Sequence, residues 1–222
     1  MKTVVVTGAS RGFGRALAVE FSASAKVFAI GRDAAALAET VALAQADRVQ
    51  PVVLDLRDEN AVTDFFASLD SLDILINNAG IAQVKPLLDS STDDLRDVLE
   101  TNLVAAFVVM REGARKMAAR GGGHIINIAS DAAMRGIQNM TAYCASKHAL
   151  LGMSRTAQLE LHAQNVRVTS FNPGPIKTEI LGELSNQDSA MPTQELARLV
   201  VHLSQIPPQI AVHEILVQPS SL

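Results

Sequence analysis

The segment TAYCASK, residues 141–147, holds the only tyrosine of the chain and a lysine four positions after it. Side chains four residues apart lie on one face of a helix, so Tyr143 and Lys147 would be neighbours there. A phenol ordinarily has a pKa of about 10 and a lysine ammonium one of about 10.4, so Lys147 is charged at neutral pH. A cation a few ångströms away favours the phenolate and eases proton exchange with an alcohol or carbonyl oxygen. The spacing also arises by chance, and an unrelated pair on a helix surface is the alternative interpretation.

A second stretch with chemical potential is TGASRGFG, residues 7–14, between a β-branched run and an Ala-rich run. Gly8, Gly12 and Gly14 would allow a tight turn, close approach to a pyrophosphate, and close packing of helix on strand. The N-terminus of the following helix would then offer free N–H groups and its positive dipole end to the phosphates. The pattern predicts dinucleotide binding, with a plain turn as the alternative.

Short apolar runs alternate with longer Ala- and Leu-rich stretches along the chain. The expected strands are 3–7, 26–30, 51–55, 73–77, 124–130, 166–171 and 213–218. The expected helices are 13–24, 33–46, 58–69, 91–119, 141–163 and 193–205. This alternation predicts right-handed βαβ units and a doubly wound parallel sheet of about seven strands, with helices on both faces. The chain has no linker, repeat or break in composition, so we expect one α/β domain over residues 1–222. Ligands of such sheets bind at the carboxyl ends of the strands.

Composition excludes several function classes. The 19 basic and 23 acidic side chains give a net charge of −4 without a Lys/Arg cluster, which argues against nucleic-acid and membrane-surface partners. The chain opens directly into a strand and its apolar runs are too short to span a bilayer, so we expect a cytoplasmic protein. The only cysteine, Cys144, cannot form an intramolecular disulfide and is expected to pack. No metal site is expected, because the histidines lie far apart: His124, His148, His162, His202 and His213.

In order and spacing, these motifs resemble those of the short-chain dehydrogenase/reductase family, in its compact single-domain branch. The family pattern T-G-x-x-x-G-x-G is matched by Thr7, Gly8, Gly12 and Gly14. The T-G-x-x-G-x-x-G spacing of another branch fits less well. The resemblance implies a Rossmann-like fold, a nicotinamide cofactor and reversible hydride transfer between the nicotinamide and a carbonyl or secondary alcohol.

The resemblance also assigns the contacts of the cofactor. Asp55 and the backbone N–H of Leu56 would bind the adenine edge, and Thr178 would bind the nicotinamide carboxamide. The family motif N-N-A-G corresponds to residues 77–80, and the Pro-Gly pair to NPGPIKT at 172–178. The residues that we expect around the cofactor are Gly8, Ser10, Arg11, Gly12, Phe13, Gly14, Arg32, Asp55, Leu56, Asn78, Ala79, Gly80, Tyr143, Lys147, Pro173, Gly174, Ile176 and Thr178.

The end of the second strand favours NADP(H) over NAD(H). An acidic residue there would bind the ribose 2′-hydroxyl and repel a 2′-phosphate, but this strand ends at Gly31. Arg32 follows, and it could hold a phosphate through two hydrogen bonds, with Arg11 as a second cation. Two alternatives remain open. Both arginines could be solvated surface charges, or a small shift could bring Asp33 to the ribose.

The resemblance completes the reacting centre. Ser130, thirteen residues before Tyr143, corresponds to the family's catalytic serine and could hold the reacting oxygen beside the phenol. Asn102 corresponds to a residue that helps to hold a water between the lysine and solvent. The expected catalytic residues are therefore Asn102, Ser130, Tyr143 and Lys147, with Tyr143 as the acid/base. The alternatives are a non-catalytic, nucleotide-binding regulatory protein on the same fold, and a metal-free isomerase or lyase.

The chain departs from the family after the Pro-Gly motif. Only a short substrate loop, at about 179–192, precedes the last expected helix. The substrate, a small carbonyl or alcohol compound, is therefore the least defined part of the prediction. Asp131, Met134, Arg135 and Gln138 could face it, or could be ordinary loop residues. The resemblance implies a homodimer or homotetramer paired through the helices 91–119 and 141–163.

Overall fold

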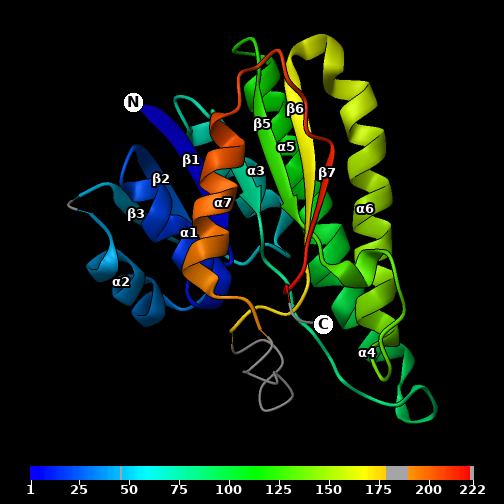
Figure 1. The fold of residues 1–222 in the computed structure, drawn as a ribbon. Coiled ribbons are helices and arrows are strands. Elements are labelled where there is room, and N and C mark those ends of the chain that lie inside the picture. The colour runs from blue at the N-terminus through cyan, green and yellow to red at the C-terminus, as the bar shows by residue number, and fades with distance from the viewer. Residues whose placement is uncertain (46, 179–189, 221–222) are drawn as a thin grey trace.

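Seven parallel strands form one sheet in the computed structural model, which describes residues 1–45, 47–178 and 190–220 (Figure 1). Their order across the sheet is β3-β2-β1-β4-β5-β6-β7. The strands are β1 (Lys2–Thr7), β2 (Ala25–Gly31), β3 (Val49–Val53), β4 (Ile74–Asn77), β5 (Gly123–Ile128), β6 (Val166–Pro173) and β7 (Glu214–Val217). The predicted doubly wound α/β sheet is thus confirmed.

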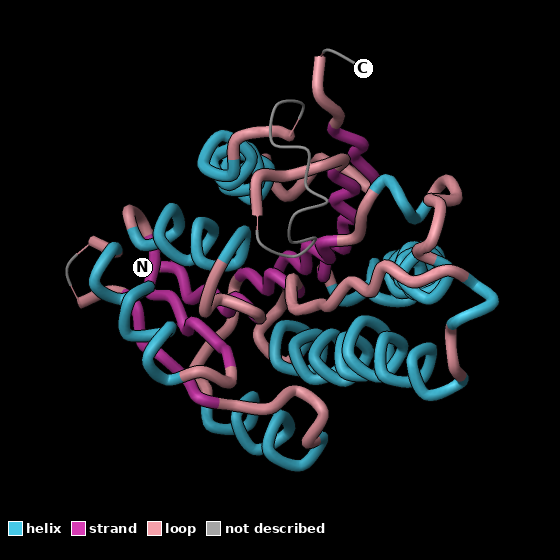
Figure 2. Tube along the Cα trace, turned by 90° about the horizontal axis from the view of Figure 1, so that it is seen from below, coloured by secondary structure: helices cyan, strands magenta, loops and turns pink. Residues whose placement is uncertain are grey.

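Two layers of helices enclose the sheet, whose strands Figure 2 shows in magenta between them. The helices are α1 (Gly12–Ser22), α2 (Ala34–Leu43), α3 (Glu59–Ser68), α4 (Thr92–Leu99), α5 (Ala105–Ala118), α6 (Thr141–Leu161) and α7 (Thr193–Gln205). Alternate residues of β1 divide between the layers, as the pleat requires. Val4 and Val6 pack with α1, α2 and α7, whereas Val5 packs with α3 and α5. Both faces of the strands are therefore buried, which explains their nearly continuous apolar sequences.

The strand order reverses between β1 and β4, and this junction prepares a site. The chain builds β1, β2 and β3 outward in one direction and then returns to place β4 on the other side of β1. The loops after β1 and β4 consequently diverge from adjacent strand ends. The Thr7 hydroxyl joins them by accepting hydrogen bonds from the backbone N–H groups of Asn78 (2.9 Å) and Ala79 (3.0 Å). In open α/β sheets such a crevice is where ligands bind.

The single helix predicted over 91–119 is wrong in one respect. It begins as expected, with a capping box in which Ser91 and Asp94 bond each other's backbone N–H groups. Between α4 and α5, however, Glu100–Val104 form a π-helical segment. A π-helical turn holds an extra residue, and it rotates the side chains that follow relative to those before it. Asn102 lies in this segment, so the irregularity falls at a predicted site residue.

β3 and β5 each end two residues earlier than predicted, at the carboxyl edge of the sheet. β3 ends at Val53 and β5 at Ile128, so Asp55 and Ser130 lie two residues beyond their strands. Each side chain bonds a following backbone N–H instead: Asp55 accepts from Arg57 and Ser130 from Ala132. Such local bonds compete with the ladder of the sheet and turn the chain. They direct both polar groups into loops at the crevice.

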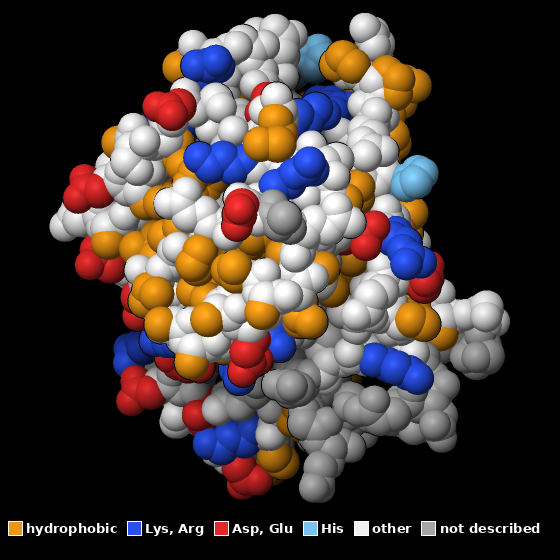
Figure 3. Space-filling model, turned by 90° about the vertical axis from the view of Figure 1, so that its left-hand side faces the viewer, with side chains coloured by type: hydrophobic (Ala, Val, Ile, Leu, Met, Phe, Trp, Pro, Cys, Tyr) orange, Lys and Arg blue, Asp and Glu red, His pale blue; other side chains and the backbone are white. Residues whose placement is uncertain are grey.

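The surface matches the balanced composition. On the face drawn in Figure 3, Lys and Arg side chains are interspersed with Asp and Glu. Within the described part of the chain, no helix is both long and apolar enough to cross a membrane.

Candidate active site

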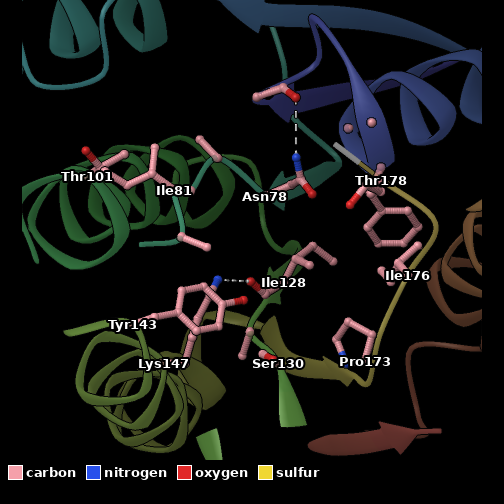
Figure 4. Close-up of a pocket in the computed structure, with 18 of the residues that line it drawn as sticks. Asn78, Ile81, Thr101, Ile128, Ser130, Tyr143, Lys147, Pro173, Ile176 and Thr178 are labelled. Carbon is pink, nitrogen blue, oxygen red and sulfur yellow. Dashed lines mark hydrogen bonds between the residues drawn. The ribbon is translucent and has the colours of Figure 1, made fainter. Parts of the chain in front are cut away.

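A cavity of about 460 Å³ opens at the carboxyl ends of the strands, lined by the loops after β1 to β6 and by α6 (Figure 4). Every residue that the sequence assigns to the cofactor lines this cavity, and so does Ser130. Asn102 is the one predicted site residue that does not line it. The structure therefore brings together segments separated by most of the chain.

The glycine loop forms one wall of the cavity. Gly8 and Gly12 have φ angles of 66° and 54°, a region that favours glycine. Gly14 is required by packing, because a Cβ there would lie 2.1 Å from the carbonyl oxygen of Gly8. Arg15, on the first turn of α1, stabilises the loop by donating from Nε to the carbonyl oxygen of Ser10 at 3.2 Å. The N-terminus of α1 thus opens toward the cavity, in the arrangement that could hold a pyrophosphate.

The loops after β1 and β2 each contribute one cation to this part of the cavity. Gly31 and Arg32 line the cavity, with Arg11 from the glycine loop. Both guanidinium groups are exposed, and neither forms an ion pair with a described residue. Asp33 caps α2 instead, since its Oδ1 accepts from the N–H of Ala36 at 3.0 Å. The carboxylate that could have bound a ribose is therefore engaged in the start of a helix.

The loop after β3 adds a residue that the sequence analysis missed. Asp55 and Leu56 line the cavity as expected, and the next residue, Arg57, lines it as well. The Arg57 guanidinium bonds Asp97 at 2.6 Å and the Thr101 hydroxyl at 3.1 Å, and so ties this loop to the end of α4 and the π-helical segment. Its position directly after Asp55 and Leu56 was the only signal in the sequence.

The two asparagines of NNAG are structural supports. Asn77 is buried, and its Nδ2 donates to the carbonyl oxygen of Ala106 and to Asn127 Oδ1, which joins β4 to α5 and β5. Asn78 lies at the cavity, and its Nδ2 donates to the carbonyl oxygen of Thr7 at 2.9 Å (Figure 4). The motif therefore fixes the floor of the crevice between the loops after β1 and β4.

At the other end of the cavity three polar groups converge. Tyr143 and Lys147 extend from α6, and Ser130 comes from the segment after β5 (Figure 4). The Lys147 side chain is only 4% exposed, and its Nζ donates to the carbonyl oxygen of Ile128 at 2.9 Å. The same Nζ lies 5.7 Å from the centre of the Tyr143 ring. The two side chains thus share a helix face, as their spacing predicts.

The proton affinities of this pair depart from the prediction. Burial lowers the pKa of Lys147 to about 8, because the ammonium loses its water. Burial likewise raises the pKa of Tyr143 to about 12. A hydrogen bond from Ser130 works in the opposite direction, and the Asp131 carboxylate raises the pKa further. In the protein by itself, burial therefore outweighs the groups that lower the pKa of the phenol.

The side chain of Asn102 lies behind the cavity and does not line it. Its side chain is 1% exposed, and Oδ1 accepts from the N–H of Ile81 at 2.8 Å. Nδ2 donates to the carbonyl oxygen of Ile81 and to the Ser146 hydroxyl, so both amide hydrogens are used. The amide therefore fixes the segment after β4 behind the cavity. Its predicted role in holding a water would fall to the main chain of the π-helical segment.

Part of the cavity wall is apolar. Ile81 and Ala82 follow β4, while Ile137 and Met140 come from the loop before α6. The sequence analysis missed these four, although the last two lie between the predicted catalytic residues Ser130 and Tyr143.

Of the four loop residues considered for substrate contact, Asp131 and Arg135 line the cavity, whereas Met134 and Gln138 do not. The predicted substrate loop, 179–192, lies outside the described residues up to residue 189. From residue 190 the chain is described again, and Met191 forms a bridge to Ile176 beside the cavity.

The remaining reactive side chains have structural surroundings. Cys144 is buried against Ala132 and Met140, which agrees with the predicted packing role. His124 is buried on β5 and its Nε2 lies 2.8 Å from the Thr169 hydroxyl. Among the described residues, no three His, Cys, Asp or Glu side chains gather as a metal site would require.

Comparison with known proteins gives consistent matches over nearly the whole chain. The family described as short chain dehydrogenase matches residues 2–189. A 3-oxoacyl-acyl-carrier-protein reductase from Aquifex aeolicus is 33% identical over 84% of this chain and 78% of its own. An L-xylulose reductase from Homo sapiens is also 33% identical, over 81% of this chain and 73% of its own. The crystal structure of serine dehydrogenase from Escherichia coli superposes with a TM-score of 0.88 and 29% identity, covering 99% of both chains.

The glycine loop yields a direct test. In Gly14→Ala the new methyl group would meet the backbone oxygen of Gly8, which cannot move without opening the loop. We expect a loss of about 1–3 kcal/mol in the free energy of unfolding and at least roughly tenfold weaker binding of a nicotinamide dinucleotide. Denaturant titration and calorimetric binding measure the two effects.

The matched control is Gly152→Ala in the exposed middle of α6. A Cβ there meets no atom of the described chain within 4 Å, so we expect unchanged nucleotide binding and up to about 1 kcal/mol of added stability. Parent-like nucleotide affinity in Gly14→Ala would show that the loop does not approach a ligand closely.

Proposed function

The chain belongs to the short-chain dehydrogenase family, and from this premise we propose that it is an NADP(H)-dependent oxidoreductase whose acid/base is Tyr143. As a member of this family it acts on CH–OH or C=O groups with a nicotinamide cofactor. The proposal adds the cofactor preference and the role of the phenol. One observation carries it: the phenol, the ammonium and the serine hydroxyl converge in a cavity whose opposite wall is the glycine loop.

In the proposed reaction, the residues of α6 and β5 handle the proton while hydride moves at carbon. A bound nicotinamide would supply or accept the hydride, and its oxidised form would add a positive charge to the cavity that holds Tyr143. In reduction, Tyr143 gives its proton to the substrate oxygen, and in oxidation it takes a proton from the alcohol. The Ser130 hydroxyl holds that oxygen beside the phenol, where it stabilises developing negative charge.

Lys147 is suited to restore the proton of Tyr143. Its pKa of about 8 lies near neutral pH, so the ammonium can give up a proton at little cost and regain it. The bond from Nζ to Ile128 fixes the ammonium at one place below the phenol. The apolar side chains at this end, Ile81, Ile137 and Met140, limit the access of water. The cavity can therefore deliver a proton to one side of a bound carbonyl.

The proposed preference for NADP(H) rests on the charges at the end of β2. Arg11 and Arg32 present two exposed guanidinium groups beside Gly31, which has no side chain to block a phosphate. Asp33 follows Arg32 in the chain and could have bound the ribose, but its carboxylate caps α2 instead. Arginine binds phosphate through paired, charge-assisted hydrogen bonds, so a 2′-phosphate would be favoured there over a hydroxyl.

We further propose that two copies of the chain associate through α5 and α6. Both helices leave large apolar side chains in water on the monomer, among them Phe107 on α5 and Leu159 on α6. Burying such side chains against a second copy would remove them from solvent. The proposal is a homodimer, with a tetramer as a further assembly of such pairs.

The role of Tyr143 is tested by Tyr143→Phe, which removes one oxygen from the cavity. We expect the catalytic efficiency with NADPH on a panel of ketones and aldehydes to fall by at least about a hundredfold, since proton transfer is lost. Cofactor affinity should remain that of the parent, because the phenol contributes little to holding the nucleotide. Turnover equal to that of the parent would refute the mechanism. If the parent binds NADPH but converts no member of the panel, the non-catalytic alternative gains support.

The cofactor preference is tested with Arg32→Ala. We expect NADPH to bind the parent more tightly than NADH, and the substitution to weaken NADPH alone by roughly tenfold, or about 1.4 kcal/mol. Arg96→Ala is the control, because Arg96 is exposed on α4 and pairs with Asp93 outside the cavity. Dissociation constants for both nucleotides give the answer. Tighter binding of NADH by the parent would overturn the assignment.

A further inference from the structure

Asp131 is a carboxylate buried directly beside the proposed reacting centre. It follows Ser130 in the chain, is 4% exposed, and lines the same cavity as Tyr143. A buried charge of this kind is costly unless it is paired and hydrogen-bonded. Both of its oxygens are in fact used, so its surroundings define what it does there.

One oxygen holds the serine. The Ser130 hydroxyl donates to Asp131 Oδ1 at 3.1 Å and accepts from the N–H of Ala132 at 3.1 Å. These two bonds fix the position of the Ser130 oxygen from the segment after β5, and its single hydrogen turns from Asp131 to the phenol or to the substrate oxygen when the serine takes part in the reaction. Serine alone has a freely rotating hydroxyl, so the carboxylate supplies the constraint.

The other oxygen holds an arginine. Arg135 donates from Nε and Nη2 to Asp131 Oδ2, at 2.9 and 2.6 Å. The guanidinium lies at the mouth of the cavity with its side chain 54% exposed, so its positive charge sits between the buried carboxylate and water. Asp131 begins the short helical turn Asp131–Ala133, and Arg135 lies in the bend that follows it, so the ion pair closes this loop on itself.

We propose that Asp131 and Arg135 are positioning residues of the reacting centre: Asp131 holds the Ser130 hydroxyl, and Arg135 neutralises the carboxylate beside the Tyr143 phenol. This inference rests on the proposed function for its catalytic meaning. The electrostatic effect of the two residues on the pKa of Tyr143 does not depend on the proposed function. The Asp131 carboxylate raises the pKa of Tyr143. Arg135, which is bonded to that carboxylate, would limit this effect with its positive charge.

The other charges around the phenol are few. Lys147 and Cys144 share its helix, and Asp131 with Arg135 face it from the segment after β5. The cavity walls at Ile81 and Ala82, and from Pro173 to Ile176, are uncharged. The remaining charged side chains of the cavity come from the loops after β1, β2 and β3, namely Arg11, Arg32, Asp55 and Arg57. The ion pair is thus the part of the surroundings that substitution can change without altering α6.

The composition of the chain makes the phenol directly measurable. Tyr143 is the only tyrosine and there is no tryptophan, so the near-ultraviolet absorbance of phenolate reports this one group. In Asp131→Asn a negative charge is lost and the phenol should titrate roughly one pH unit lower than in the parent. In Arg135→Met the carboxylate is left without compensation and the phenol should titrate at higher pH than in the parent. Arg135→Lys keeps the cation and should titrate near the parent.

The same variants should move the pH profile of alcohol oxidation, which requires the phenolate. We expect the acid limb of the catalytic efficiency to shift to lower pH in Asp131→Asn and to higher pH in Arg135→Met. The double variant, with both charges removed, should lie near the parent. Asp93→Asn with Arg96→Met removes an exposed ion pair on α4 and should shift neither measurement.

Opposite shifts of the phenol in the two single variants support the inference. Equal titration in all variants, or shifts in one direction, overturns it. If Asp131→Asn does not fold, the comparison of Arg135→Met with Arg135→Lys still shows in which direction the Tyr143 pKa shifts when the cation is removed. Failure of the proposed function is distinguishable, because Tyr143→Phe would then keep its turnover while the phenol of the other variants still shifted.

Discussion

The burial of Lys147 is the constraint on which the rest of the site depends. An ammonium withdrawn from water must be offered acceptors inside the protein, and here the carbonyl oxygen of Ile128 accepts from Nζ at 2.9 Å. That carbonyl is available because β5 ends there, at the carboxyl edge of a parallel sheet. α6 then places Tyr143 one turn earlier, over the same strand end. The cost of burying the lysine appears in its pKa of about 8, which is also the property that fits it to exchange protons near neutral pH.

The reversal of strand order between β1 and β4 creates the crevice that lies opposite Lys147. The crevice between the loops after β1 and β4 is held by the Thr7 hydroxyl and by Asn78, and the glycine loop closes it by direct backbone contact of Gly8 and Gly14. The glycine loop and the segment that carries Ser130 therefore both lie at the carboxyl edge of one sheet. A displacement of either loop would separate groups that must act on the two ends of one C–O bond.

The sequence predicts the parts of this structure that depend on local rules, and misses those that depend on tertiary surroundings. The glycine loop and the Tyr143–Lys147 pair followed from spacing, because a turn and a helix face are local. The π-helical segment at Glu100–Val104 did not, since apolar periodicity cannot show one extra residue within a helix. The spacing shows that Lys147 lies near Tyr143, but it cannot show the burial that raises the pKa of the phenol. The commitment of Asp33 to the cap of α2 was likewise hidden until the start of that helix was known.

The central claim is that Tyr143 becomes an effective acid/base once the positive nicotinamide ring lies beside it. The most direct measurement is the near-ultraviolet titration of this single tyrosine with and without saturating NADP⁺. By itself, the protein should titrate high, in keeping with a pKa of about 12 for the buried phenol. The account predicts a clear fall of that pKa with the oxidised cofactor bound, because a cation close to the phenol stabilises the phenolate. A Tyr143 pKa that stays unchanged when NADP⁺ is bound would contradict it.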